Sequence, residues 1–566
     1  MRFWQLSLLL GSELLASATA PEIVQHLHVR IPMRDGVHLA ANIFLPSGTA
    51  RFPAILVRTP YGKGTELTPN YRAFVEHGYA MIVEDVRGRY ESEGTFDPFG
   101  QEPRDGDDTL NWIASRPWSD GKIGMMGGSY LGIAQWKVAL LNNPHLKAIA
   151  PVVSGYDDYR DRFYSTGGAF QLGHRLLWMA ENLRASGFAG PAFDRYVRAL
   201  PIRNSDFAAT GQRCDSFQKA LNHPADDAFW RSMSTREHLD KIRVPVLTVG
   251  GWYDNFVESD LAAFSALQHN SGVHRIVIGP WPHNMSIKFP GVDFGRQSGA
   301  PIRRMQLEWF DQWLKSKDTP IMSRPPVQIF VMGANRWREE HEWPLARAKT
   351  TALYLAGGGH ANSLDGDGAL SGRPHRRSRP DAFEYDPRNP VPTEGGANCC
   401  NPAVFPWGPM DQRSIERRRD VLVFTSPPLR EDLEVTGVVR VILYAATSAP
   451  DTDFTAKLVD VFPNGEARNL TDGILRLRYR TALDKPELAS QGEIYKLIID
   501  AGVTSNLFLK GHSVRVEISS SNFPRFDRNP NTGRPVADET TLRKAYQVIY
   551  HDPARPSCVL LPVIPN

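Results

Sequence analysis

The sequence has little net charge, few cysteines and no long hydrophobic run after its first 20 residues. A formal charge of +3 over 566 residues and a single basic stretch at 373–379, which we interpret as a solvated loop, argue against a nucleic-acid partner. Without an apolar stretch long enough to cross a bilayer, no membrane partner is expected either. Neither C-x-x-C nor H-E-x-x-H occurs, so no metal or other cofactor is predicted.

The cysteines are too sparse for a disulfide-based scaffold. Only 4 are present: Cys214, Cys399, Cys400 and Cys558. The adjacent Cys399 and Cys400 could bridge each other only with strain, or one of them could reach Cys558 or Cys214. The spacing leaves these pairings open.

The first 20 residues have the pattern of a secretory signal. Arg2 precedes an apolar stretch over 6–15, and Ala18-Thr19-Ala20 forms an A-x-A cleavage pattern before Pro21. We therefore predict a signal peptide at 1–20 and a secreted or periplasmic mature protein. Glu13 interrupts the apolar stretch, so a buried first helix is the alternative.

The rest of the chain is typical of a large globular protein. Its hydrophobic fraction is 42%, with 46 Gly and 43 Pro in many turns, and its length predicts two or three domains. Apolar runs at 53–57, 79–83, 123–126 and 146–153 indicate buried strands, and 105–115 indicates a helix. This alternation predicts an α/β fold with a mostly parallel sheet.

The alternation stops between about 155 and 239, where aromatic stretches such as 175–183 indicate an inserted helical cap. Strand patterns resume at 244–249 and 275–278, before a helix at 303–314, so the sheet is completed after the insertion. Beyond about 346 many strands follow, among them 438–445, 454–461 and 514–519, which predicts a β-sandwich or jelly roll. The predicted division is an α/β core at 21–155 and 239–345, a cap at 156–238 and a β domain at 346–566.

The stretch Gly127-Gly128-Ser129-Tyr130-Leu131-Gly132 joins an apolar run to a helical pattern. Glycines permit the cramped backbone of a tight strand-to-helix turn, and the N–H groups of a helix start stabilise developing negative charge. Ser129 is therefore predicted to be a nucleophile. In the usual Gly-x-Ser-x-Gly pattern a glycine takes the place of Leu131, so a packing turn is the alternative.

A carboxylate and a histidine follow later strands in the order that such a nucleophile needs. Asp254 comes after the strand at 244–249, and His283 comes after the strand at 275–278. A histidine must take the serine proton, and a buried carboxylate must orient the imidazole. Asp254 alone could cap a helix near Phe256, and His283 is one of 16 histidines, but together they predict a Ser-His-Asp triad.

Further motifs extend over nearly the whole mature chain. They are Arg34-Asp35-Gly36-Val37, Arg58-Thr59-Pro60-Tyr61, Asp85-Val86-Arg87-Gly88-Arg89, Trp118-Ser119-Asp120-Gly121-Lys122-Ile123-Gly124, Gly251-Trp252-Tyr253-Asp254, Gly279-Pro280-Trp281-Pro282-His283 and Arg419-Asp420-Val421-Leu422-Val423-Phe424. With the Ser129 stretch, they resemble the cocaine esterase and X-prolyl dipeptidyl aminopeptidase-like serine hydrolases, which include α-amino acid ester hydrolases and glutaryl-cephalosporin acylases.

The resemblance implies an α/β-hydrolase core with a helical cap and a C-terminal jelly roll. It also implies that Ser129 is the nucleophile, Asp254 the triad acid and His283 the base. The family's oxyanion hole, a tyrosine hydroxyl with the N–H that follows the nucleophile, falls on Tyr61 and Tyr130. The expected reaction is hydrolysis of a small-molecule ester or amide through an acyl-enzyme.

Substrate preference is less well defined by the sequence. Family members that prefer free α-amino groups need carboxylates near the serine, and Asp157, Asp158 and Asp161 are candidates, although a solvated acidic turn fits equally well. Aromatic residues of the cap, Phe163, Tyr164, Phe170 and Trp178, either line an apolar acyl pocket or belong to the cap core. We therefore favour an esterase or acylase that takes an apolar or aromatic acyl group, with an X-Pro dipeptidyl-peptidase or an α-amino acid ester hydrolase as the alternative.

The β domain has a second interpretation. It could bind carbohydrate or a partner protein as its main role, because strand-rich domains carry such sites. We favour a supporting role at the active site through residues 398–407. The sequence leaves a homo-oligomer open.

Overall fold

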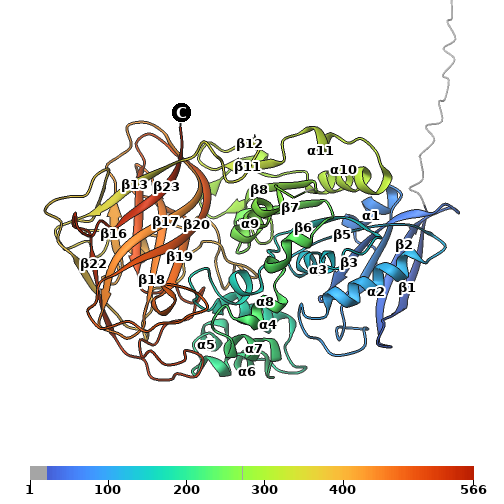
Figure 1. The fold of residues 1–566 in the computed structure, drawn as a ribbon, viewed down its shortest axis with the longest axis horizontal. Coiled ribbons are helices and arrows are strands. Elements are labelled where there is room, and N and C mark those ends of the chain that lie inside the picture. The colour runs from blue at the N-terminus through green and yellow to red at the C-terminus, as the bar shows by residue number, and fades with distance from the viewer. Residues whose placement is uncertain (1–21, 271, 566) are drawn as a thin grey trace, which may run out of the picture.

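The computed structural model describes residues 22–270 and 272–565. The predicted signal peptide at 1–20 lies outside these residues. Figure 1 shows an α/β part and a β-rich part side by side, with short helices packed between and below them. This is the expected α/β-hydrolase core with a cap and a C-terminal β domain; the numerical domain boundaries stay a prediction.

The α/β part is built on a ten-stranded sheet with the order β1-β2-β4-β3-β5-β6-β7-β8-β11-β12. Its strands are β1 (Ile23–Pro32), β2 (His38–Pro46), β3 (Phe52–Thr59), β4 (Ala80–Asp85), β5 (Ser119–Gly128), β6 (Leu146–Val152), β7 (Val246–Tyr253), β8 (His274–Pro282), β11 (Val327–Val331) and β12 (Arg336–Glu340). All pairings from β4 to β11 are parallel, whereas β1, β2 and β12 pair antiparallel. The carboxyl ends of the central strands therefore meet at one edge, where α/β folds bind ligands.

Helices cover both faces of this sheet. They are α1 (Pro69–Glu76), α2 (Glu102–Ala114), α3 (Tyr130–Ala139), α9 (Val257–Leu267), α10 (Ile302–Lys315) and the short α11 (Pro320–Ser323). In β3, Leu56 shares a core with α2, α3 and α9, whereas Val57 shares another core with α1 and α10. Because neighbouring strand residues face opposite sides, these two helix groups cover opposite faces.

The cap lies between β6 and β7. A six-residue π-helical segment, Asp158–Phe163, begins it, followed by α4 (Leu172–Asn182), α5 (Phe193–Tyr196), α6 (Ser205–Thr210), α7 (Asp215–Asn222) and α8 (Ala228–Met233). The cap core, which includes Leu176 and Trp230, also contains Phe523 of the β domain. The cap is therefore packed between the other two parts.

The β-rich part forms an eleven-stranded sheet with the order β15-β22-β17-β23-β13-β14-β16-β21-β18-β19, in which β20 pairs with β17. Its strands are β13 (Lys349–Ala356), β14 (Ala369–Ser371), β15 (Asp381–Tyr385), β16 (Leu422–Thr425), β17 (Leu433–Thr447), β18 (Asp453–Val461), β19 (Ala467–Arg476), β20 (Tyr495–Phe508), β21 (Ser513–Ser519), β22 (Ala545–Tyr550) and β23 (Cys558–Ile564). One hydrophobic core joins these strands to β7, β8 and β11, so the two sheets are packed together.

The sequence patterns locate most of the central elements. All the strands and helices predicted by residue range are confirmed, with boundaries that differ by a few residues. The sequence analysis missed β1, β2, β11 and β12. The edge strands β1 and β12 carry weak apolar patterns because many of their residues are exposed, whereas β2 and β11 are mostly buried and were overlooked. A one-turn helix, α12 (Arg413–Glu416), and the two-residue strands β9 (Lys288–Phe289) and β10 (Val292–Asp293) were also missed.

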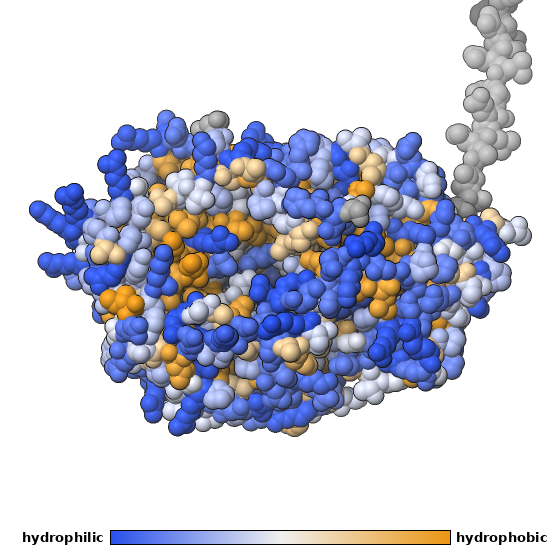
Figure 2. Space-filling model, viewed as in Figure 1, coloured by the Kyte–Doolittle hydropathy of each residue, from blue (hydrophilic) through white to orange (hydrophobic). Residues whose placement is uncertain are grey.

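The surface combines charged residues with apolar patches. Figure 2 shows apolar side chains gathered over β17 and β20, where Val438 and Ile498 are exposed. Val438 also lines a cavity of about 600 Å³ between the cap, α9 and the β domain. Among residues 22–270 and 272–565, no helix combines the length and apolar character needed to cross a membrane.

Candidate active site

Ser129 occupies a strained turn between the end of β5 and the start of α3. Its φ of 56° lies in the left-handed region, which is uncommon for a residue with a Cβ and is found at functional sites. Gly127 has φ 135°, and a Cβ there would lie 2.5 Å from Leu131. At Gly132 a Cβ would lie 2.5 Å from Ser154, so the turn needs glycine at 132 although Leu131 takes the usual glycine position.

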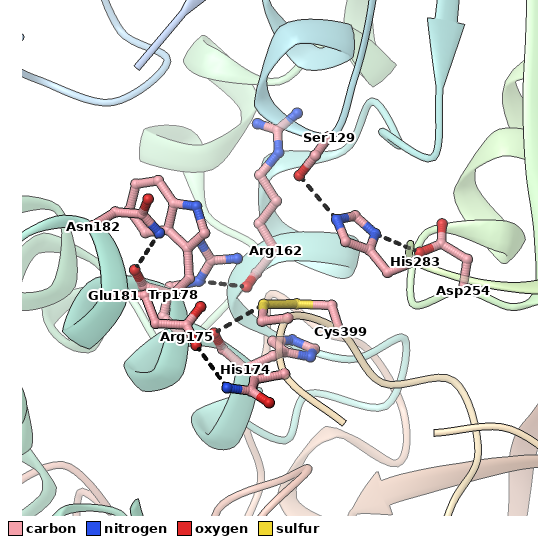
Figure 3. Close-up of a disulfide and its surroundings, with 12 residues drawn as sticks. Ser129, Arg162, His174, Arg175, Trp178, Glu181, Asn182, Asp254, His283 and Cys399 are labelled. Carbon is pink, nitrogen blue, oxygen red and sulfur yellow. Dashed lines mark hydrogen bonds and ion pairs between the residues drawn. A yellow bond between two sulfur atoms is a disulfide. The ribbon is translucent and has the colours of Figure 1, made fainter. Parts of the chain in front are cut away.

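Three side chains form a hydrogen-bonded row at the carboxyl ends of the strands. Ser129 directly follows β5, Asp254 follows β7 and His283 follows β8. The Nε2 atom of His283 lies 3.0 Å from the Ser129 Oγ, and its Nδ1 lies 2.7 Å from the Asp254 Oδ1. Figure 3 shows this row from Ser129 through His283 to Asp254. The structure thus brings together the three residues predicted as a triad.

Asp254 is completely buried, and its carboxylate makes a hydrogen bond in addition to the one with the His283 imidazole. Its Oδ2 accepts a hydrogen bond from the Phe256 N–H at 3.2 Å, just before α9 begins. The N-cap residue of α9 is Phe256 and has no side-chain cap hydrogen bond, so Asp254 does not cap the helix as the alternative interpretation offered, although it fixes the turn before it. Fixed at both oxygens, the carboxylate holds one orientation toward the imidazole.

Tyr61 and the first N–H of α3 converge beside Ser129. The Tyr61 hydroxyl accepts a hydrogen bond from the Trp178 Nε1 at 3.0 Å. Burial raises the pKa of Tyr61, while hydrogen bonds with Trp178, the Ser129 side chain and the Tyr130 backbone act in the opposite direction. A raised pKa keeps the phenol protonated, so it can donate a hydrogen bond to an anion at this point.

The walls of the Ser129 pocket are mainly aromatic. The Tyr130 ring stacks on Phe99 at 4.7 Å and lies parallel to Trp178 at 6.5 Å. The lining residues are Tyr61, Phe99, Ser129, Tyr130, Ile133, Arg162, His174, Arg175, Trp178, Asn255, Phe256, His283, Cys399 and Cys400. The free volume is about 30 Å³, enough for about two water molecules, so the pocket beside Ser129 is narrow.

A disulfide between Cys399 and Cys400 forms part of this wall. Figure 3 shows it beside His174 of the cap. It belongs to the segment of the β domain, 398–407, that was expected to support the site. Cys214 and Cys558 are buried and free, so of the pairings that the sequence left open, the structure contains the one between neighbours.

The carboxylates proposed to bind an ammonium group lie elsewhere. Asp158 pairs with Lys137 at 2.5 Å and with Arg162, and Asp157 pairs with Arg236 at 2.6 Å. Both are buried, so they do not form a solvated acidic turn, and neither lines the Ser129 pocket. The prediction that Asp157 and Asp158 bind substrate there is corrected, because each carboxylate is already paired with a cation, Lys137 and Arg162 for Asp158 and the partly buried Arg236 for Asp157.

Asp161 does not line the Ser129 pocket either. It accepts hydrogen bonds from the Ser259 hydroxyl at 2.6 Å and from the N–H groups of Tyr156 and Asp157. With Asp157 it lines the cavity of about 600 Å³. This cavity and the Ser129 pocket share Asn255 alone among the described lining residues.

Most of the aromatic candidates also lie outside the Ser129 pocket. Phe163, Tyr164 and Phe170 belong to the cap core, and they contact one another or Trp230 there. Only Trp178 lines the Ser129 pocket. The assignment of Phe163 and Phe170 to the pocket is therefore corrected. Helical spacing alone did not show which face of the cap helices lines the Ser129 pocket.

The sequence analysis missed His174 and Arg175, which precede Trp178 on α4, and Arg162 on the π-helical segment. Burial lowers the pKa of His174 well below its usual value, so its imidazole is neutral. Arg175 and Trp178 are three residues apart on one helix and so share a face. That spacing could have identified Arg175 once Trp178 was suspected.

Comparison with known proteins assigns the chain to a family. Residues 35–285 match the X-Pro dipeptidyl-peptidase (S15 family), and residues 320–560 match the X-Pro dipeptidyl-peptidase C-terminal non-catalytic domain. The chain is 40% identical to the cocaine esterase of Rhodococcus sp. (strain MB1 Bresler) over 568 aligned residues, which cover 95% of this chain and 98% of the relative.

Solved structures agree over almost the full length. An aminopeptidase from the marine sediment archaeon Thaumarchaeota archaeon is 26% identical, with a TM-score of 0.83 and coverage of 96% of this chain and 97% of the other. An α-amino acid ester hydrolase is 28% identical, also with a TM-score of 0.83, over 97% of this chain and 98% of the other. The chain therefore belongs to the family of serine hydrolases that includes cocaine esterase and the X-Pro dipeptidyl-peptidases of family S15.

Proposed function

We propose that this serine hydrolase cleaves small-molecule esters through an acyl-enzyme formed on Ser129. The observation that carries the proposal is the row of hydrogen bonds from Ser129 to His283 and on to Asp254. The phenol of Tyr61 and the N–H of Tyr130 complete the arrangement as the oxyanion hole.

In this mechanism His283 removes the proton from the Ser129 Oγ as it attacks the ester carbonyl. The carbonyl oxygen becomes an oxyanion and accepts hydrogen bonds from Tyr61 and the Tyr130 N–H. His283 then donates the proton to the leaving alcohol, and a water molecule releases the acid in a second, equivalent cycle. Asp254 stabilises the imidazolium form of His283 in both halves.

The chemistry of the pocket favours esters over substrates with a free α-amino group. Of the described residues that line the Ser129 pocket, none is Asp or Glu, and two are arginines. An ammonium group would be repelled there and would lack a counter-ion. A panel of benzoyl esters, amino-acid esters and X-Pro amides separates these specificities; turnover of X-Pro amides alone would reverse the preference.

Labelling with a fluorophosphonate probe tests the nucleophile. The Ser129 Oγ should displace fluoride from phosphorus, and peptide mapping should then locate the phosphonyl group on the tryptic peptide that contains Ser129. Heat-denatured protein is the control, because it lacks the hydrogen-bonded row. A label on another serine, or equal labelling of denatured protein, would contradict the assignment.

Replacement of Tyr61 by phenylalanine is expected to lower kcat for 4-nitrophenyl acetate by roughly 10²- to 10³-fold, because one oxyanion donor is lost while the ring remains. KM should change much less. Tyr79→Phe is the matched control, since its hydroxyl bonds to Asp311 outside the pocket. An unchanged kcat in Tyr61→Phe would exclude Tyr61 from the oxyanion hole.

We also propose that the protein is exported, on the basis of the A-x-A pattern at Ala18-Thr19-Ala20. Expression of the full chain in a bacterium should yield periplasmic or secreted protein whose N-terminal residue is at or near Pro21. Changing both Ala18 and Ala20 to leucine should prevent this cleavage. Cytoplasmic protein that retains residues 1–20 without these changes would refute the proposal.

A further inference from the structure

The disulfide bridge between Cys399 and Cys400 lies in the Ser129 pocket, and the proposed mechanism gives it no role. Both cysteines line that pocket. Cys399 is 8% exposed, Cys400 is half-buried, and residues 402–404 that follow are exposed. The bridge therefore lies where the wall of the pocket continues into a surface loop. A pocket that admits an ester also admits a small dithiol, so the bridge is open to reduction.

The segment that carries the bridge is anchored on both sides of it. Before the bridge, Asn398 is fully buried, and its Nδ2 donates to the carbonyls of Gly395 at 2.9 Å and Pro406 at 2.6 Å. After the bridge, Phe405 is 1% exposed, and its ring lies 5.6 Å from that of Phe193 on α5. Opening the bridge should therefore move the residues between these anchors without releasing the segment.

The bridge holds Cys400 in an uncommon backbone conformation. Its φ is 87°, in the left-handed region that a residue with a Cβ keeps only when the surrounding structure imposes it. A disulfide also keeps its two sulfur atoms at bonding distance, whereas non-bonded atoms stay about 3.5 Å or more apart. Once the bond is broken, the sulfur atoms must separate, and Cys400 is free to leave the left-handed region.

The structure supplies an acceptor for the sulfur atom that moves. The Cys400 Sγ lies 3.9 Å from the carbonyl oxygen of His174 on α4. In the view of Figure 3 the bridge lies between His174 and the pair of Ser129 and His283. The sulfur of a disulfide has no proton, whereas a thiol has an S–H group that donates weakly to a carbonyl. Reduction should therefore draw Cys400 toward His174 and away from Cys399, which opens this part of the wall.

We propose that the Cys399–Cys400 disulfide is a redox-active site that determines which acyl groups Ser129 accepts. Closed, it favours small acyl groups; opened by a dithiol, it admits bulkier ones. This inference rests on the proposed esterase function. In the opening step a thiolate of the dithiol attacks one cysteine sulfur and breaks the bridge, and the second thiol of the reductant then displaces that cysteine. The protein gains two electrons and two protons as two thiols, and the dithiol is oxidised to its own disulfide.

The test compares the full chain in two redox states. Protein purified without reductant is treated with dithiothreitol, which is removed by gel filtration before the assay because thiols themselves cleave activated esters. Alkylation and mass spectrometry of the peptide that contains residues 399–400 establish the state of the bridge. On reduction, the ratio of kcat/KM for 4-nitrophenyl cyclohexanecarboxylate to that for 4-nitrophenyl acetate should rise about tenfold, the scale on which pocket size discriminates between substrates. Reoxidation should restore the ratio.

Variants then connect the change to the bridge. Cys399→Ser/Cys400→Ser cannot form it and should show the ratio of the reduced protein with or without dithiothreitol. Cys214→Ala/Cys558→Ala is the matched control, because it removes the two buried free cysteines and leaves the bridge. This control should respond to dithiothreitol as the unmodified protein does. Reduction should leave the melting temperature nearly unchanged, since a bridge between neighbouring residues closes almost no loop.

The outcomes separate this inference from the function on which it rests. If Ser129-dependent hydrolysis shows the same ratio in both redox states, or a lower ratio after reduction, the inference is wrong and the esterase proposal stands. A bridge that does not form, or that dithiothreitol cannot open in the folded protein, also refutes it, as does a response that persists in the double serine variant. An equal loss of activity with both esters and a lower melting temperature would show general loosening instead. If neither redox state cleaves an ester or takes up a fluorophosphonate label, the proposed function and the inference fall together.

Discussion

Replacement of Ser129 by alanine is expected to lower kcat for ester hydrolysis by about 10⁶-fold, the scale on which loss of a triad nucleophile acts. Without Oγ no acyl-enzyme can form, and His283 has no proton to accept from the nucleophile. Some rate above that in water should remain, because the oxyanion donors still polarise the carbonyl toward direct attack by water. Initial rates with 4-nitrophenyl acetate and purified protein provide the measurement.

A suitable control lies next to the same turn. Ser154 is fully buried near Gly132, and its Oγ has no hydrogen-bond partner in the described structure. Ser154→Ala should therefore keep nearly full activity, and both variants should melt close to the unmodified protein. Turnover by Ser129→Ala within tenfold of the unmodified rate would rule out Ser129 as the nucleophile.

The second large effect is expected at Asp254. Asp254→Asn retains the shape of the side chain but presents an amide to the imidazole, which favours the wrong tautomer and does not stabilise the imidazolium. The expected loss in kcat is about 10⁴-fold. Fluorophosphonate labelling should slow in parallel, because the same general base activates Ser129 for both reactions.

Asp260 provides the comparison for this substitution. It is a buried neighbour on α9 whose carboxylate accepts a hydrogen bond from the Gly155 N–H at 3.1 Å, and burial raises its pKa well above the ordinary value. An amide replaces such a group with little change in charge, so Asp260→Asn should remain active. If both variants lose activity equally, a general electrostatic or folding effect would replace the specific role given to Asp254.

The hydrogen-bonded row of Ser129, His283 and Asp254 could be predicted because it depends on strand order. Parallel strands place their carboxyl ends at one edge, so the residues after β5, β7 and β8 are neighbours although 154 positions separate Ser129 from His283. Short apolar runs identified those strands in the sequence. The same reasoning could not locate the edge strands β1 and β12, whose residues are partly exposed.

The pocket could not be predicted from the same signals. Asp157 appeared available to a substrate because its partner Arg236 lies 79 positions away, and nothing local indicates that pairing. In the cap, the helix face that turns toward Ser129 depends on how the short helices pack against one another and against the β domain. Trp178 was identified as a candidate, whereas its neighbours Arg175 and His174 were not, since charged and polar residues on a helix are usually solvated.

The disulfide-bonded pair Cys399–Cys400 shows that the Ser129 pocket also depends on the C-terminal β domain. These residues come from the β-rich part of the protein, which contributes no member of the hydrogen-bonded row, yet they line the Ser129 pocket. A fragment that ends before β13 would retain Ser129, His283 and Asp254 but would lack one wall of the Ser129 pocket. Insertions or deletions near the bridge would accordingly alter which acids are accepted without changing how the bond is broken.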